Sequence, residues 1–162
     1  MADPFIVKDD NMFYIFYEEF TGKYRHFGGA DIGLLSSEDG ERWKRVGIVL
    51  HEPFHLSFPN VFQWKGEWYM IPEADASRQL RLYKATNFPT HWQCIHTYNL
   101  GRYADPMIYI KGDIVYLWIN SYLEGDNLRL LYSDNLLQDW KEHPCSPIRT
   151  KGNDTRPAGT IN

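Results

Sequence analysis

Residues Ser57–Glu73 read SFPNVFQWKGEWYMIPE, and this stretch decides the fold. Aromatic and β-branched residues stand on both sides of Lys65-Gly66, which is a turn signal. Such residues favour strands, so the stretch predicts two short strands, Ser57–Trp64 and Trp68–Ile71. The proline near the start of the first strand is the feature to follow along the chain, because it recurs.

The opening proline recurs about every 50 residues, as Pro4, Pro59, Pro106 and Pro157. Each of the three complete copies closes on a turn followed by a tryptophan: Trp43, Trp92 and Trp140. A period near 50 residues with four short strands per copy is typical of β-propeller blades. The sequence therefore predicts an all-β, propeller-like fold of three four-stranded blades plus the inner strand of a fourth.

The predicted blades make up a single partial propeller domain over residues 1–162. Blade 1 covers about 2–50, blade 2 about 57–98, blade 3 about 104–148, and the fourth inner strand about 154–162. In blade 1 the expected strands are Ala2–Lys8, Met12–Tyr17, Ile32–Ser36 and Trp43–Leu50, with a long loop over 18–29. In blade 3, Pro144 and Pro147 are expected to keep the last strand short.

Three blades and one strand do not close a ring, because propellers usually have at least four blades. Open strand edges and sheet faces invite pairing with other chains. Either the chain is a fragment of a longer gene, or it assembles with copies of itself, and a two-fold dimer is the simplest such assembly. A homodimer or another self-assembly through the open blades is thus expected.

The composition excludes several classes of function. The net charge of −4 and the pI near 5.8 argue against nucleic-acid binding, which requires a clustered basic face. No apolar run is long enough for a membrane span, so no membrane partner is expected. The N-terminus lacks the features of a signal peptide, which favours a cytoplasmic location, although a leader removed earlier would allow export.

Neither the cysteines nor the histidines indicate a metal or another cofactor. The two cysteines, Cys94 and Cys145, do not make a disulfide framework. The six histidines lack zinc-ligand spacing. No cofactor is therefore expected. His55, just ahead of the second inner strand, is a candidate sugar contact; otherwise it is a solvated loop residue.

The residues that precede the four prolines are the main functional candidates: Asp3, Phe58, Asp105 and Arg156. Proline drives the preceding residue toward an extended conformation. If the repeats are blades, these residues occupy equivalent places around the mouth of a central channel. Carboxylates accept hydroxyl hydrogen bonds, an aromatic ring stacks on a sugar face and arginine donates a rigid fork, so the set suits a saccharide.

Each candidate also has a structural interpretation. An aspartate at a strand start can cap the strand and satisfy loop amides. Arg156 can pair with Asp105 or Asp3 and so lower the pKa of the carboxylate, which would not suit a general acid. The regular placement of the three tryptophans favours packing between blades over a sugar platform.

The chain resembles a known family over nearly its whole length. The resemblance is carried by Ser57–Phe62, Trp68–Glu73, Leu82–Ala85, Phe88–Trp92, Leu131–Asp134, Trp140–Pro144 and Arg156–Gly159. These motifs are similar to the propeller domain of glucosamine inositolphosphorylceramide transferases. That domain in turn resembles the five-bladed propellers of family 43 glycosidases, arabinanases, levansucrases and invertases. The family's propeller has five blades, whereas this chain carries three and a strand, so it departs from the family at its C-terminal end.

The resemblance to family 43 implies roles for several carboxylates. Asp3 matches the base and Asp105 matches the residue that orients the general acid. The general acid itself would lie beyond Asn162, which puts hydrolysis in doubt because glycosidases need a pair of carboxyl groups. Glu73 is the best internal substitute; its alternative is a solvated carboxylate at a strand end, and the same alternative is stronger for Asp75.

Three functions follow as hypotheses. The first is a carbohydrate-active propeller, either a glycosidase or a relic of one, whose catalytic candidates are Asp3, Asp105 and Glu73. The second is a non-catalytic glycan-binding module, with Phe58, Arg156 and His55 as substrate-binding candidates. The third is a protein–protein scaffold, because the fold alone does not decide the function. We expect a glycan or small sugar as the ligand and leave catalysis open.

Overall fold

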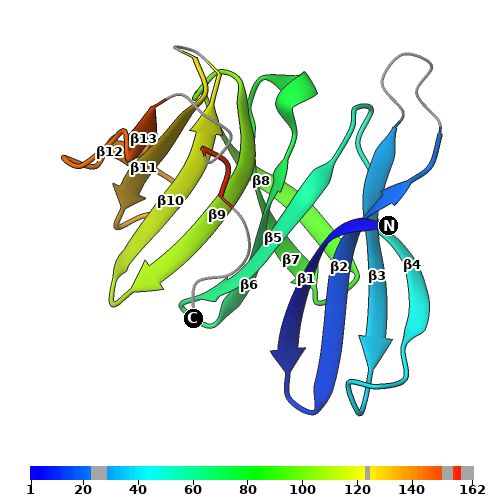
Figure 1. The fold of residues 1–162 in the computed structure, drawn as a ribbon. Coiled ribbons are helices and arrows are strands. Elements are labelled where there is room, and N and C mark those ends of the chain that lie inside the picture. Colours follow the sequence, from blue (N-terminus) through cyan, green and yellow to red (C-terminus); the bar gives the residue numbers. More distant parts are fainter. Residues whose placement is uncertain (23–28, 123–124, 151–154, 158–162) are drawn as a thin grey trace.

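The computed structural model describes residues 1–22, 29–122, 125–150 and 155–157. Three antiparallel sheets follow one another along the chain and lie side by side (Figure 1). The first contains β1 (Ala2–Asp9), β2 (Met12–Phe20), β3 (Ala30–Ser37) and β4 (Lys44–Leu50). Each strand pairs with the next one in sequence, so the sheet is an up-and-down blade.

The second and third sheets repeat this order. The second contains β5 (Ser57–Trp64), β6 (Glu67–Glu73), β7 (Leu80–Asn87) and β8 (His91–Tyr98), with the 3-10 turn η1 (Asp75–Ser77) between β6 and β7. The third contains β9 (Tyr103–Lys111), β10 (Ile114–Ser121), β11 (Asn127–Ser133) and the two-residue β12 (Lys141–Glu142), while β13 (Arg149–Thr150) also pairs with β11. The predicted all-β fold of propeller blades is confirmed.

The strand bounds differ from the prediction mainly in the first blade. The loop expected over 18–29 is shorter, because β2 runs to Phe20 and pairs with Ala30 at the start of β3. The predicted fourth inner strand, about 154–162, lies mostly outside the described residues; Thr155, Arg156 and Pro157 are described and are not in a strand. No helix in the described part of the chain is long and apolar enough to cross a membrane.

The blades pack through apolar cores between neighbouring sheets. One core joins the first sheet to the second and includes Phe16 and Met70, and another joins the second to the third and includes Ile71 and Leu117. Inner strands β1 and β5 lie next to each other, as do β5 and β9. Burying aromatic and aliphatic faces in this way is the main stabilising contribution to such a stack of sheets.

Two repeat tryptophans pack between blades, as predicted. Trp92 of β8 meets Phe16 of β2 edge-on, with ring centroids 5.7 Å apart. The rings of Trp140 and of Tyr98 in the second sheet pack together, with their centroids 5.7 Å apart. Trp43, on the first blade, is only half-buried and donates its indole N–H to the Gly40 carbonyl at 3.2 Å. The repeat tryptophan thus packs against the neighbouring blade in the second and third blades.

The backbone at the repeat prolines contradicts the expected extended conformation. Asp3, Phe58 and Asp105 have φ values of 46°, 45° and 50°, in the left-handed region. The strand register shifts at the same place in each blade, which is the signature of a β-bulge. A non-glycine residue there costs about 1–3 kcal/mol, and such strain is often found at functional sites. Each first strand therefore begins with a bulge.

Candidate functional site

The structure brings three sequence candidates together at the junction of the second and third blades. Asp105 lies in the bulge near the start of β9 and is 7% exposed, while Glu73 ends β6. Arg156 donates from Nη2 to Oδ1 of Asp105 at 2.8 Å and from Nε to Oδ2 of the same carboxylate. Its Nη2 also lies 3.6 Å from Oε2 of Glu73. One guanidinium thus bridges two carboxyl groups.

The bulge in β9 explains why Glu73 approaches so closely. In the ladder between β9 and β10, Met107 pairs with Trp118 and Ala104 pairs with Asn120, so Asp105 falls in the irregular step. A bulge leaves an extra residue outside the regular ladder. The Asp105 N–H instead donates to Oε2 of Glu73 at 2.8 Å. The strained backbone is therefore used to link two blades.

The electrostatics of the cluster favour a protonatable Glu73. Burial raises the pKa of Glu73 from 4.5 to about 7, and the nearby negative charge of Asp105 adds to this. The Asp105 N–H and the Arg156 charge act in the opposite direction, but they do not cancel the effect of burial. The hydrogen-bonded Asp105 raises the pKa of Arg156, which stays a cation. Near neutral pH the site holds a fixed ion pair and a carboxyl group able to exchange a proton.

Each blade carries a polar residue at the position of Glu73. Glu73 pairs with Ser57 in register, Glu18 with Ala2, and Asn120 with Ala104. Each of these side chains contacts a residue that comes after its own blade in the sequence. Oε1 of Glu18 lies 3.4 Å from Nε2 of His55, and Nδ2 of Asn120 donates to Oγ1 of Thr155 at 2.9 Å. The position is a repeated polar link from one blade to the next.

Sequence reasoning missed Glu18 and Asn120. The sequence predicts a loop at Glu18, whereas the structure has Glu18 in β2, paired with the residue before Asp3. This strand pairing is the signal that identifies Glu18. Burial raises the pKa of Glu18, and a hydrogen bond to Asp3 does so as well. The structure therefore places Asp3 beside Glu18 at the first blade junction, whereas Asp105 and Glu73 meet at the second.

The remaining sequence candidates have distinct places. Phe58 is 7% exposed and packs edge-on against Phe5, with ring centroids 4.8 Å apart, in a small core that includes Met107. Its ring serves packing of the inner strands in this structure, in place of the open sugar platform that was expected. His55 is half-buried and, besides meeting Glu18, lines the pocket next to Glu73.

A pocket of about 480 Å³ lies beside the cluster. It is lined by His55, Glu73, Asp75, Ala76, Arg78 and Arg102. Arg102 and Asp75 form a two-pronged ion pair with a shortest distance of 2.6 Å, and the Arg102 guanidinium lies 5.3 Å from the centre of the Tyr122 ring. Among the described residues, no group of three or more His, Cys, Asp or Glu side chains is arranged to hold a metal ion.

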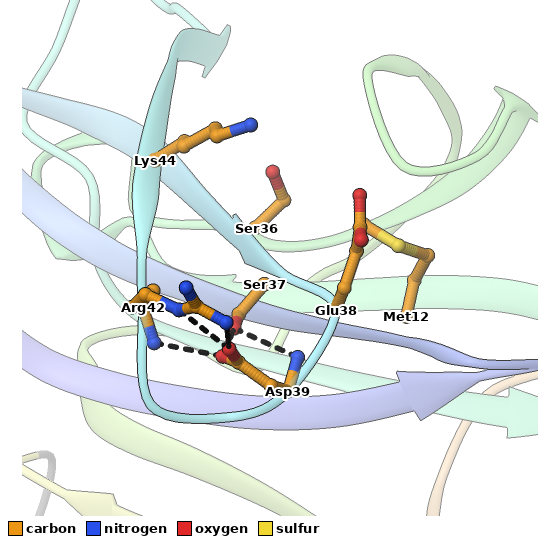
Figure 2. A pocket seen from close by; sticks show the side chains of 7 residues that line it. All are labelled: Met12, Ser36, Ser37, Glu38, Asp39, Arg42 and Lys44. Atoms are coloured by element: carbon orange, nitrogen blue, oxygen red, sulfur yellow. Dashed lines mark hydrogen bonds and ion pairs between the residues drawn. The ribbon is translucent and has the colours of Figure 1, made fainter.

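The charged side chains that line a second pocket serve to shape a turn. Figure 2 shows the side chains that line this pocket, around the turn that joins β3 to β4. Because β1 and β3 run in the same direction, this turn is at the opposite end of the blade from Asp3. Asp39 accepts hydrogen bonds from the N–H groups of Glu41 and Arg42, at 2.9 and 2.8 Å, and pairs with the Arg42 side chain. These bonds hold the pKa of Asp39 well below its usual range. The carboxylate is occupied in shaping its own turn.

Comparison with known proteins now places the chain. The pattern that defines the N-terminal region of glucosamine inositolphosphorylceramide transferase 1 matches residues 1–161. The chain belongs to this family. It is 36% identical over 155 residues to glucosamine inositolphosphorylceramide transferase 1 of Arabidopsis thaliana, and 32% identical over 154 residues to the protein of that name from Oryza sativa subsp. indica. Each match covers 91% of this chain and 20% of the relative, so the chain spans about one fifth of their length.

Two solved structures that are similar to this family member are glycoside hydrolases. A family 117 glycoside hydrolase of the marine bacterium Zobellia galactanivorans has a TM-score of 0.76 at 18% identity, over 94% of this chain and 58% of the other. A thermostable family 43 glycoside hydrolase has a TM-score of 0.73 at 14% identity, over 93% and 56%. At these identities the likeness shows the fold alone. It confirms a partial propeller of the glycoside hydrolase type.

Proposed function

We propose that this domain binds a saccharide at the junction of blades 2 and 3, in the pocket beside Asp105, Glu73 and Arg156. The observation that carries the proposal is the charged cluster at the pocket wall, where a strained bulge and an arginine bridge fix two carboxyl groups. Preorganised polar groups in a concave site are what saccharide recognition needs. The similarity to a glucosamine inositolphosphorylceramide transferase and to glycoside hydrolases supports the same class of ligand.

The donor and acceptor pattern suits sugar hydroxyl groups. A hydroxyl group both donates and accepts, so it pairs well with a carboxylate on one side and a guanidinium on the other. The Arg156 side chain is 56% exposed, so part of its donor fork faces outward. Glu73 is the member of the cluster that lines the pocket and would make the direct contact.

Binding without turnover is the function that the cluster supports best. The Asp105 carboxylate is held on both oxygens by Arg156. A two-pronged contact with a guanidinium holds a carboxylate in one place and one orientation. Asp105 therefore suits a positioning role, and the predicted base, Asp3, has its described contact with Glu18.

A second candidate function is glycoside hydrolysis with Glu73 as the general acid. The raised pKa of Glu73, about 7, favours this reading because a general acid works best when its pKa lies near the operating pH. Slow release of the chromophore from aryl arabinosides or xylosides, abolished in Glu73→Gln, would support it. Equal rates for the wild type and Glu73→Gln would rule out hydrolysis at this site.

Titration with saccharides tests the binding function. Neutral hexoses, pentoses and uronates would be titrated into the wild type and into Arg156→Lys, which keeps the charge but loses the fork that grips Asp105. We expect saturable binding to the wild type and a loss of about tenfold or more in Arg156→Lys. Arg42→Lys, at the far end of blade 1, is the matched control and should bind like the wild type. Equal affinity in all three proteins would refute the assigned site.

A further inference from the structure

The pocket beside Glu73 is lined by two guanidinium groups, Arg78 and Arg102, and by two carboxyl groups, Glu73 and Asp75. Asp75 is paired with Arg102 at 2.6 Å, and Glu73 lies 3.6 Å from Arg156. Arg78 also lines the pocket, and its side chain has no hydrogen bond or ion pair with any residue in the described ranges. The two carboxylates already have partners, so the charge of Arg78 is left over on the pocket wall.

The loop around η1 fixes the place of Arg78. Its φ of 56° lies in the left-handed region, and its N–H donates to the Asp75 carbonyl at 2.9 Å. The Ser77 hydroxyl bonds the Ala74 and Gln79 carbonyls at 2.8 and 3.1 Å. From below, the buried Tyr103 hydroxyl donates to the Gln79 carbonyl at 3.0 Å. The turn is tied on both sides, so the guanidinium starts from a fixed backbone.

We propose that Arg78 makes this pocket selective for anionic saccharides, with the acidic group of the sugar on Arg78 and its hydroxyl groups toward Glu73. This rests on the proposed saccharide-binding function and names its ligand class. Arginine presents a planar fork that matches a carboxylate or a phosphate in a two-pronged contact. A guanidinium without a carboxylate partner on the wall of a concave site also attracts anions from solution.

The proposed ligand is a sugar that carries a pair of anionic oxygens, and either a uronate or a sugar phosphate could supply them. A titration followed by NMR chemical shifts, which detects millimolar binding, separates these sources. Glucuronate and galacturonate are compared with glucose and galactose, and glucose 1-phosphate forms a third arm. The proteins are the full chain, Arg78→Gln, and Arg42→Gln as a control arginine at the opposite end of blade 1.

We expect the wild type to bind the uronates or glucose 1-phosphate about tenfold more tightly than the neutral hexoses, as a charge-assisted contact implies. The Arg78→Gln protein should bind acidic and neutral sugars alike, and Arg42→Gln should behave like the wild type. If neutral hexoses bind as tightly as the acidic sugars, or the preference survives in Arg78→Gln, the assignment of Arg78 is wrong while the saccharide site stands. If no sugar of either kind produces saturable shifts, both proposals fail.

Discussion

The main-chain N–H of Asp105 donates a 2.8 Å hydrogen bond to Oε2 of Glu73, and this bond joins the first strand of blade 3 to the second strand of blade 2. The donor is free for this bond because the bulge removes it from the β9–β10 ladder. The acceptor has a pKa near neutrality. The hydrogen bond between the two blades is thus coupled to the protonation state of Glu73.

The first prediction concerns the pH dependence of stability. The pKa of Glu73 is raised from 4.5 to about 7 in the folded state, so its contribution is fully present below about pH 4.5 and is lost as the pH rises through about 7. Relative to Glu73→Gln, the wild type should lose on the order of 3 kcal/mol of unfolding free energy across this range. Urea denaturation at a series of pH values measures it.

Glu67→Gln is the control for that experiment, because Glu67 is at the exposed start of the same strand. Its pH profile should run parallel to that of the wild type. Parallel profiles for the wild type and Glu73→Gln would mean that Glu73 titrates normally in the folded protein.

The second prediction concerns a buried link between the inner strands. Oδ1 of Asn60 accepts a 2.8 Å hydrogen bond from the Ile108 N–H, and Asn60 is 2% exposed. Asn60→Ala would leave that N–H unpaired in the interior, which costs about 1–3 kcal/mol. Chemical denaturation would detect the loss. Asn11→Ala, in the exposed β1–β2 turn, should change stability little; equal effects of the two variants would show that the link adds nothing.

The third prediction separates the repeat tryptophans. Trp140 is 8% exposed and packs on Tyr98 of the neighbouring blade, whereas Trp43 is only half-buried. Trp140→Ala should cost about 3–5 kcal/mol, as truncations of large buried aromatics do, and Trp43→Ala clearly less. Thermal and urea unfolding of both variants test this. A similar cost at both positions would mean that Trp43 is also packed against a covering surface in solution.

The fourth prediction concerns the uncovered face of the first blade. Ile6, Val61 and Ile108 each stand two residues after a repeat proline, and they are 61%, 6% and 6% exposed. Val46 and Ile48 of β4 are exposed on the same blade, at 47% and 37%. Because open strand edges and exposed apolar side chains favour pairing with another chain, we propose that a second copy of the chain covers this face.

Light scattering tests that proposal directly. The wild type should have twice the 19.1 kDa mass of one chain, and Ile6→Asp should shift it toward the monomer. Lys111→Asp, at the exposed end of β9 in the third blade, is the control and should leave the mass unchanged. A wild-type monomer at all concentrations would contradict self-assembly and leave the face to some other occupant.

Much of the fold follows from the sequence because the repeat is expressed in local signals. Prolines, turn pairs such as Lys65-Gly66 and the repeat tryptophans each have a local preference that agrees with the blade. The bulges were beyond such reasoning, because the rule for residues before proline predicts extended backbone at Asp105, where tertiary packing imposes φ of 50°. Local backbone preference therefore predicts the wrong conformation at the bulges, where neighbouring blades meet.

The site was predictable in part for the same reason. Asp105 and Arg156 share a repeat position, so the sequence brought them together before the structure did. Glu18 could be identified only from the pairing of β1 with β2, because β2 continues beyond its expected end. Arg78 lies in a turn with no repeat counterpart among the predicted features, and its role depends on which neighbouring carboxylates are already paired. Only the three-dimensional arrangement provides that information.

The measurement that tests the central claim most directly is the chemical shift of the Asp105 backbone amide during titration with uronates and neutral sugars. This N–H contacts Glu73, so a saccharide in the adjacent pocket should move its resonance in a saturable way, while the amide of Glu41 in the distant β3–β4 hairpin stays in place. Saturable shifts at Asp105 and its neighbours are the result we predict. Shifts confined to other parts of the chain, or none with any sugar, would contradict a saccharide site at this blade junction.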